Sequence, residues 1–334
     1  MQNKEELSLY IHIPFCVRKC GYCDFLSAPA DEKARDRYVQ ALLMEIERYR
    51  GTETADRKIK TLYIGGGTPT SLSDKVFARL LQAVERKLLQ SNCEGLQHLR
   101  EFTVEAGRPD CFSAAKLAAM EAAGVNRISV NPQSFHDKTL QLIGRRHSVR
   151  DFYNAYELVR KSRIPVVNVD LIIGLPQETE QEIAYSLEQA VKLVPENLTV
   201  HTLTLKRSAP LFQKQEQAVL TTQAAEKMVQ RAAEMAAAIG LEPYYLYRQH
   251  YMLGHLANIG YAKPGTESIY NIQMMEERHP VIGVGPASAS KVPLPDGHHL
   301  HKLNMPKNVA VYGARLQELA ERRRDLFNIE GTDL

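Results

Sequence analysis

The segment Ile13–Phe25, with the sequence IPFCVRKCGYCDF, decides the fold of this chain. It holds Cys16, Cys20 and Cys23 in the spacing C-x3-C-x2-C, and no fourth cysteine is near. Iron–sulfur clusters are normally held by four cysteine thiolates. Three thiolates can hold three irons of a cubic [4Fe–4S] cluster and leave the fourth iron open to a ligand. The spacing therefore favours a cluster at which chemistry takes place.

Zinc binding and disulfide formation are the alternatives for these cysteines. A structural zinc site takes four ligands, commonly in C-x2-C pairs, and only Cys20 and Cys23 form such a pair. His12 is available as a further ligand, but it alternates along an expected strand, which can turn it away. Cys93 and Cys111 are isolated, and five cysteines is an odd number for a disulfide-bonded protein. The open cluster remains the favoured interpretation.

The composition is that of an ordinary globular protein. The chain has 334 residues, of which 44% are hydrophobic and 24% charged, and its net charge of +3 is too small to indicate nucleic-acid binding. The densest basic run, Glu321–Arg324, is expected to be a solvated helix face. No signal-peptide-like stretch opens the chain and no run is long enough for a membrane span, so we expect a cytoplasmic protein with reduced thiols.

Short apolar runs alternate with longer amphipathic stretches in the first two thirds of the chain. This alternation predicts a parallel sheet with helical crossovers. The expected strands are Leu7–Ile13, Lys60–Ile64, Phe102–Glu105, Arg127–Val130, Val166–Ile173 and Leu198–Leu203. The expected helices are Asp31–Arg50, Ser73–Leu89, Ala114–Ala123, Val149–Ser162 and Glu178–Leu193. Six such units predict an α/β fold, an open partial (β/α)6 barrel instead of a closed eight-stranded one.

The pattern changes after about residue 206. A helix is expected at Thr221–Ile239, an irregular region at Pro243–Pro295 and a last helix at Lys307–Arg324. We therefore predict a partial barrel over residues 1–210 and a smaller C-terminal α+β module over residues 211–334 that covers the substrate.

Polar residues and glycines follow the expected strands. The run Gly65–Thr70 follows the second strand, Glu105 ends the third, Gln133 follows the fourth and Asp170 lies in the fifth. Ligand sites of α/β sheets form at the carboxyl ends of the strands, and consecutive glycines let a ligand approach the backbone. Taken singly, each polar residue can be a satisfied structural group. Together they indicate a functional site beside the cysteine loop.

These motifs resemble those of the radical S-adenosylmethionine (SAM) enzymes, which share the cysteine triad, an aromatic residue before its last cysteine and a following GGGTP run. A closer resemblance is to the oxygen-independent coproporphyrinogen III oxidases. It rests on Tyr10–Cys16, Gly65–Thr70, Val125–Ser129, Gln133–Phe135 and Asp170–Pro176. The C-terminal stretches Pro243–Gln249, Gly260–Gly265 and Tyr270–Gln273 are similar to the coproporphyrinogen dehydrogenase branch of Gram-positive bacteria.

The resemblance implies a set of cofactor-binding residues. Cys16, Cys20 and Cys23 would ligate the [4Fe–4S] cluster. The residues implied in SAM binding are Tyr10, Tyr22, Gly66, Gly67, Thr68, Glu105, Gln133, Arg145 and Asp170. Thr68, Gln133, Arg145 and Asp170 match positions that line a second SAM in this group, and Arg146 competes with Arg145 for its place. Catalytic residues beyond these are not implied.

The implied activity converts coproporphyrinogen III to protoporphyrinogen IX in haem biosynthesis. A 5′-deoxyadenosyl radical removes hydrogen from the β-carbon of a propionate, and loss of CO2 and one electron leaves a vinyl group. A donor such as flavodoxin or ferredoxin would supply electrons to a monomeric enzyme. Four propionates need cations, and the candidates are Arg18, Lys19, Arg145, Arg146, Lys206, Arg207, Arg248 and Lys263. Arg248 and Lys263 are the substrate residues we predict in the C-terminal part.

Two other functions remain open. Phe25 stands where the best-studied oxidases carry a further cysteine, as it does in the haem-chaperone branch. The histidine–asparagine haem motif of that branch is not evident, although His250 and Asn258 are present. A haem chaperone with the same fold is therefore one alternative, and a radical SAM enzyme with another substrate is the second.

Overall fold

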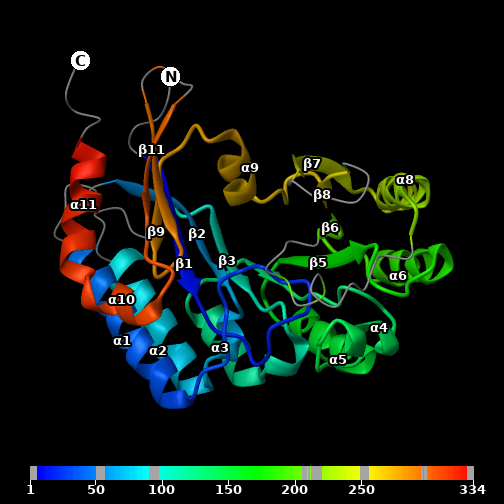
Figure 1. Cartoon of the computed structure of the whole chain (residues 1–334), viewed down its shortest axis with the longest axis horizontal. Coiled ribbons are helices and arrows are strands. Elements are labelled where there is room, and N and C mark those ends of the chain that lie inside the picture. The colour runs from blue at the N-terminus through cyan, green and yellow to red at the C-terminus, as the bar shows by residue number, and fades with distance from the viewer. Residues whose placement is uncertain are drawn as a thin grey trace.

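The computed structural model describes residues 6–49, 57–89, 98–204, 209, 211, 220–248, 256–294, 296 and 299–328. Among these residues the strands form one 11-stranded sheet in the order β11-β10-β9-β1-β2-β3-β4-β5-β6-β8-β7 (Figure 1). Cys93, Lys206, Arg207 and His250 lie outside the described residues. No helix in the described ranges combines the length and apolarity needed to cross a bilayer.

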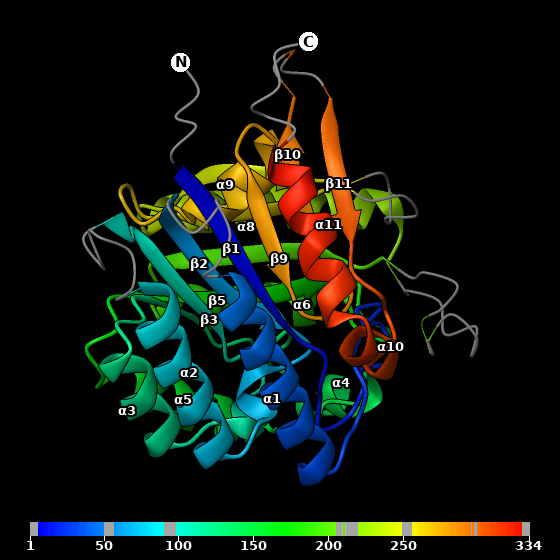
Figure 2. The same ribbon diagram turned by 90° about the vertical axis from the view of Figure 1, so that its left-hand side faces the viewer.

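The six predicted β/α units are confirmed as a run of parallel strands. The strands are β1 (Glu6–Ile13), β2 (Lys58–Gly66), β3 (Glu101–Glu105), β4 (Arg127–Ser129), β5 (Val166–Ile173) and β6 (Asn197–Thr202). Helices α1 (Glu32–Tyr49), α2 (Asp74–Val84), α3 (Ala114–Ala122), α4 (Asp137–Leu142), α5 (Val149–Arg160) and α6 (Glu180–Lys192) follow them. The helices cover one face of the curved sheet, as a partial barrel requires (Figures 1 and 2).

Local sequence explains where these helices begin. Ser148 and Thr179 each accept a hydrogen bond from the backbone N–H three residues later. Asp151 and Glu182 return a carboxylate to the N–H of the capping residue, which completes a capping box. The acidic side chains also favour the positive ends of the helix dipoles.

A continuous apolar core joins the sheet to its outer helices. Leu9, Ile11 and Ile13 of β1 are fully buried, and Leu62 and Ile64 of β2 lie beside them. Strands covered on both faces read as nearly continuous apolar runs, which is why the sequence marks them clearly.

The C-terminal third extends both edges of the sheet. Strands β7 (Glu242–Tyr247) and β8 (Asn258–Ala262) add to β6 in antiparallel fashion. At the other edge β9 (Val281–Val284) pairs parallel to β1, and β10 (Ala289–Pro293) and β11 (Leu300–Asn304) continue antiparallel. The expectation of an irregular region at 243–295 is therefore wrong, because its short strands are stabilised by pairing with distant partners. The division at residue 210 stays a prediction.

Three further helices accompany these strands. They are α8 (Thr222–Ala238), α10 (Val309–Ala314) and α11 (Leu316–Asn328). The predicted last helix is divided at Arg315, which lies between α10 and α11.

Helix α11 is tied to α1 by a buried ion pair. Arg323 is 4% exposed, and its guanidinium donates to the Glu45 carboxylate and to the Gly283 carbonyl oxygen. Tyr312 also donates to Glu45. The expectation that the whole basic run is solvated is therefore wrong for Arg323, which has a buried carboxylate partner from a distant helix.

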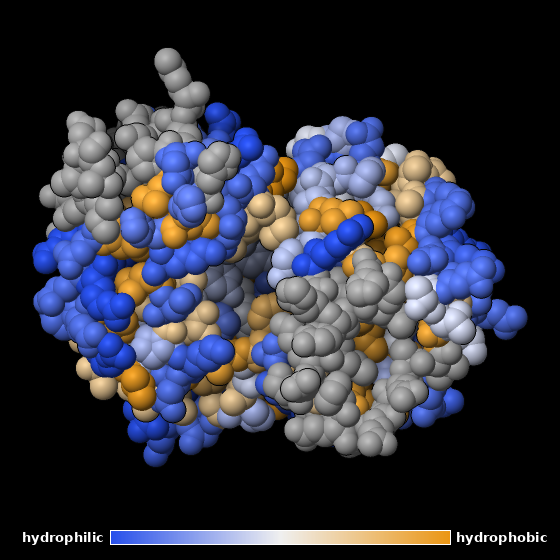
Figure 3. All heavy atoms as spheres, turned by 45° about the horizontal axis from the view of Figure 1, so that its top comes forward, coloured by the Kyte–Doolittle hydropathy of each residue, from blue (hydrophilic) through white to orange (hydrophobic). Residues whose placement is uncertain are grey.

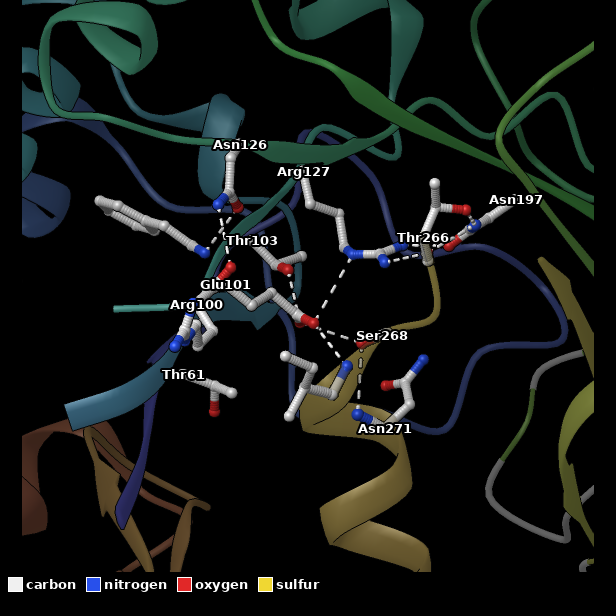
Figure 4. Close-up of polar contacts among 12 residues, drawn as sticks. Thr61, Arg100, Glu101, Thr103, Asn126, Arg127, Asn197, Thr266, Ser268 and Asn271 are labelled. Atoms are coloured by element: carbon white, nitrogen blue, oxygen red, sulfur yellow. Dashed lines mark hydrogen bonds and ion pairs between the residues drawn. The ribbon is translucent and has the colours of Figure 1, made fainter. Parts of the chain in front are cut away.

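Helix α9 (Ile269–Glu276) lies on the face of the sheet opposite the outer helices (Figure 1). Glu101, 3% exposed at the start of β3, accepts hydrogen bonds from the Ser268 hydroxyl and the Ile269 N–H (Figure 4). Arg127 lies 3.7 Å from the same carboxylate and donates to the Thr266 carbonyl oxygen. This polar network fixes the N-terminus of α9 at the amino ends of the strands.

We predict that Arg127→Met lowers the free energy of unfolding by about 3 kcal/mol or more, because it leaves the buried Glu101 carboxylate without its cation. Urea unfolding of the two proteins measures the difference. Arg100→Met is the matched control, since Arg100 is exposed one residue before Glu101. Equal losses in the two variants would contradict the role given to Arg127.

Candidate functional site

The cysteine loop leaves the carboxyl end of β1 and folds back on itself. Cys16 and Cys20 are both 6% exposed, and Cys23 is partly exposed. Backbone hydrogen bonds join Cys16 to Ala28 and Cys23 to Cys20. The Gly21 N–H donates to the Ile143 carbonyl oxygen at 2.9 Å. The loop is thus held in place by contacts that leave the three sulfurs free of disulfides.

Each of the two buried sulfurs has a polar neighbour. The Thr68 hydroxyl lies 3.2 Å from the Cys16 sulfur, and the Arg108 guanidinium donates to the Cys20 sulfur at 3.1 Å. Burial raises the pKa of the Cys23 thiol.

The loop fits the cluster better than a zinc ion. Within the described residues, no three His, Cys, Asp or Glu side chains converge as ligands of a single metal ion. His12 hydrogen-bonds Tyr10 at 2.9 Å and the Leu26 carbonyl oxygen at 3.2 Å, so its nitrogens are engaged away from the cysteines. In a four-iron cube each thiolate binds its own iron, so the sulfurs need not meet at one point. Three thiols without a fourth ligand suit such a cube with one open iron.

The glycine run brings β2 against the cysteine loop. The Gly67 N–H donates to the Ile13 carbonyl oxygen at 2.8 Å, and a Cβ on Gly67 would lie 2.5 Å from the Phe15 carbonyl oxygen. Gly66 has a φ of 112°, and a Cβ there would meet the His12 ring at 2.6 Å. Gly67 therefore requires glycine for space, and Gly66 requires it for its backbone conformation as well.

Glu105 faces Gly66 from the end of β3. The Tyr63 hydroxyl donates to one of its carboxylate oxygens at 2.7 Å, and the Gly66 N–H donates to the other at 3.0 Å. Burial raises the pKa of Glu105 to about 7 despite these two hydrogen bonds, which lower it. The nearby Asp170 charge adds to the rise. The carboxyl group can therefore hold or release a proton near neutral pH.

Asp170 and Gln133 form part of the opposite wall. Asn168 donates to the Asp170 carboxylate at 2.6 Å, and a His201 ring nitrogen lies 3.6 Å from it. Gln133 has a φ of 68°, and its backbone bonds to the Asp170 carbonyl oxygen and the Ile172 N–H. Its side-chain oxygen is buried without a hydrogen-bond partner. Such an orphaned group is suited to a bound ligand.

Arg145 joins this wall to the cysteine loop. Its guanidinium donates to the Gly107 carbonyl oxygen at 2.6 Å and to the Tyr22 hydroxyl at 3.0 Å. Burial and this arginine act in opposite directions on Tyr22, and burial prevails, so the pKa of Tyr22 is raised. Arg146 is exposed and does not line the pocket. Of the two competing arginines, Arg145 is the one directed inward.

These groups surround one cavity of about 410 Å³, within the range for small-molecule sites. The molecular face in Figure 3 is hollowed near its centre. The predicted residues that line the cavity are Cys16, Cys20, Tyr22, Cys23, Gly66, Gly67, Thr68, Glu105, Gln133, Arg145 and Asp170. These residues are far apart in the sequence, and they meet here because they lie at or near the carboxyl ends of parallel strands.

Besides Arg146, five predicted residues do not line the cavity: Tyr10, Arg18, Lys19, Arg248 and Lys263. Tyr10 stacks against Tyr270 with ring centroids 6.0 Å apart, behind the wall. Arg248 is exposed just after β7. Lys263 is exposed after β8, and its N–H donates to the Glu196 carbonyl oxygen at the amino end of β6. Because β8 runs antiparallel to β6, Lys263 lies beside the amino end of β6, whereas the cavity lies at the carboxyl ends of the parallel strands.

Sequence reasoning missed several lining residues: Tyr63, Arg108, Asn131, Asn168, His201, Tyr245, Asn258 and Asn271. Strand alternation could have predicted Asn168 and Tyr63. Asn168 lies two residues before Asp170 on β5, and Tyr63 lies two residues before Gly65 on β2, so each shares a face with a predicted site position. Asn271 could not be predicted in this way, because its place depends on α9 folding against the inner face of the sheet.

The chain is similar to known proteins that contain a radical SAM domain or are named for porphyrin or haem. Residues 10–190 match the family model described as the radical SAM superfamily. The chain is 38% identical to an oxygen-independent coproporphyrinogen-III oxidase-like protein, HemZ, of Bacillus subtilis, over 96% of this chain and 64% of that protein. It is 34% identical to the heme chaperone HemW of Escherichia coli, over 88% of this chain and 72% of that protein.

A solved structure shares the fold. The coproporphyrinogen III oxidase HemN of Escherichia coli, described as a radical SAM enzyme, superposes with a TM-score of 0.76 at 22% identity. The match covers 96% of this chain and 71% of that one. This agrees with the predicted partial barrel.

We predict that Glu105 makes the stability of the cofactor-free protein depend on pH. Its pKa is about 7 when folded, against 4.5 ordinarily, so the native state holds an extra proton across this interval. The free energy of unfolding therefore falls as pH rises from about 4.5 to about 7. Glu105→Gln removes this contribution, so the variant should gain stability relative to the parent over the same interval in urea unfolding.

Glu157→Gln is the control for this experiment. Glu157 is exposed, and its hydrogen bond with Lys161 lowers its pKa, so it titrates below the interval. Parallel stability curves for Glu105→Gln and the parent would contradict the prediction.

Proposed function

The chain belongs to the radical SAM superfamily, and from that premise we propose that it decarboxylates coproporphyrinogen III oxidatively to protoporphyrinogen IX. The observation that carries the proposal is the single cavity that joins three unpaired thiols, the glycine run and Glu105 to a polar wall. The name of the Bacillus subtilis relative HemZ supports a porphyrin substrate, whereas that of HemW supports the haem-carrier candidate considered below. The chain spans 64% of the length of its Bacillus subtilis relative, so an activity named for that whole protein is only a proposal for this chain.

In this proposal Cys16, Cys20 and Cys23 hold the cluster. When bound, the reduced cluster supplies one electron to cleave SAM. Gly66 and Gly67 expose backbone groups to the methionine part of SAM, and the Glu105 carboxylate accepts a hydrogen bond from its amino group. With a pKa of about 7, Glu105 is only partly ionised at neutral pH, and a bound ammonium group would favour its anionic form.

A second SAM is proposed at the opposite wall, where Gln133, Arg145 and Asp170 meet. Gln133 offers an unused acceptor and Arg145 an unused Nε–H donor. Thr68 is proposed to line this second SAM as well; it borders the cavity, and its hydroxyl lies 3.2 Å from the Cys16 sulfur. Tyr22 positions Arg145 through their hydrogen bond.

The substrate propionates require cations, and a guanidinium binds a carboxylate through two parallel hydrogen bonds. Arg248 stays the proposed partner, carried by residues 211–334 as a substrate-covering module on the barrel of residues 1–210. Lys263 is no longer proposed, because it lies at the amino end of β6, away from the cavity. Arg248 is exposed and available to a ligand. A one-electron carrier such as flavodoxin or ferredoxin is the proposed reductant.

The decisive assay incubates the anaerobically reconstituted protein with reductant, SAM and coproporphyrinogen III. We expect mass spectrometry to detect loss of one and then two carboxyl groups from the porphyrin. Cys20→Ala should abolish the loss, because a thiolate ligand is removed. Cys111→Ala is the matched control, since Cys111 is buried and does not line the cavity. Formation of 5′-deoxyadenosine with an unchanged porphyrin mass would contradict the proposed substrate.

Haem carriage is the second candidate, favoured by Phe25. This side chain is 66% exposed and lines the cavity, where an aromatic ring can stack on a flat macrocycle. A haem chaperone should bind haem tightly at one per chain, and Phe25→Ala should weaken that binding in a titration followed by absorbance. Tyr185→Ala removes another exposed aromatic ring and is the control. Absence of stoichiometric haem binding would exclude this candidate.

A further inference from the structure

Arg108 is a buried cation pressed against the cysteine loop. It follows β3, three residues beyond Glu105, and is 3% exposed. Its Nη2 donates to the Cys20 sulfur at 3.1 Å and to the Arg18 carbonyl oxygen. The backbone contact fixes the guanidinium beside the sulfur. Among the described residues, Arg108 forms no ion pair with a carboxylate, so the sulfur is its anionic partner once ionised.

The three sulfurs have unequal surroundings. Cys16 is near a neutral hydroxyl, that of Thr68. Cys20 alone has a charged donor within hydrogen-bond distance, in the part of the chain that the structure describes. The second buried arginine of the cavity, Arg145, donates to Tyr22 and to backbone oxygen instead of sulfur. Among the described residues, the hydrogen bond from a buried guanidinium to sulfur is therefore made at one ligand position, Cys20.

Charge and hydrogen bonding at the sulfurs set the reduction potential of an iron–sulfur cluster. Reduction adds one negative charge, which a fixed guanidinium stabilises more than water would in a buried site. An N–H···S bond further withdraws electron density from the thiolate. Both effects favour the reduced state.

We propose that Arg108 is a positioning residue that raises the reduction potential of the cluster through Cys20. This inference rests on the proposed cofactor. The consequence concerns the electron donor. Because the reduction potential of the cluster is raised, a one-electron carrier that is a weaker reductant can still reduce it. Arg108 thereby widens the class of reductants that can start the reaction.

The test is a redox titration of the reconstituted full chain, followed by electron paramagnetic resonance. In Arg108→Met we expect the ratio of reduced to oxidised cluster at the parent's midpoint to fall about tenfold, which is ~59 mV for a one-electron couple. Arg108→Lys keeps the charge and should recover part of this loss. Arg18→Met is the control: it removes the same charge from an exposed side chain two residues from Cys20, where water screens it.

Equal potentials in Arg108→Met and the parent, at equal iron content, would overturn the inference. So would equal shifts in Arg108→Met and Arg18→Met. If Arg108→Met fails to hold the cluster, Arg108→Gln, which keeps an N–H donor without the charge, decides by the same criterion. No porphyrinogen is needed, so failure of the decarboxylation assay leaves this test intact. A parent protein that binds no four-iron cluster would instead refute the cofactor.

Discussion

The site depends on the close approach of the glycine run to the chain leaving β1. Gly67 lies so near the Phe15 carbonyl oxygen that a Cβ would stand 2.5 Å from it. This contact presses the Thr68 hydroxyl toward Cys16 and turns the Gly66 N–H toward Glu105. One steric constraint between the neighbouring parallel strands β1 and β2 thus sets the positions of the cysteine loop and of Glu105 relative to each other. A larger residue there would separate the two halves of the site.

Buried charge performs a second organising task at the opposite ends of the strands. Glu101 and Arg127 occupy the inner face, where an unpaired charge would be costly, and each also hydrogen-bonds the chain at the N-terminus of α9. That segment comes from the C-terminal third of the chain. Tyr270 and Asn271 of α9 then reach the wall and lining of the cavity. By holding the N-terminus of α9, the network therefore positions residues from the C-terminal third of the chain at the cavity.

The sequence predicted the six parallel strands because each is a local apolar run covered by the helix that follows. It failed for β9 and β10, since β9 pairs with β1, which lies far away in sequence, and β10 pairs in turn with β9. The strand-end residues were predictable by the same logic, as Glu105 and Asp170 illustrate. Arg108 was not, because a lone arginine in a loop resembles a surface cation until its burial and its sulfur partner are known.

The distribution of charge around the cavity explains both the compensation of the cysteine thiolates and the raised pKa of Glu105. Arg108 and Arg145 are buried beside the cysteine loop, where ionised thiolates would otherwise lack compensation. Glu105, across the cavity, is hydrogen-bonded to neutral donors and has a pKa near 7. A carboxylate paired to either arginine would be fixed as an anion. Because both cations bond to the cysteine loop and its surroundings and neither to Glu105, this carboxyl group is free to respond to a positively charged ligand.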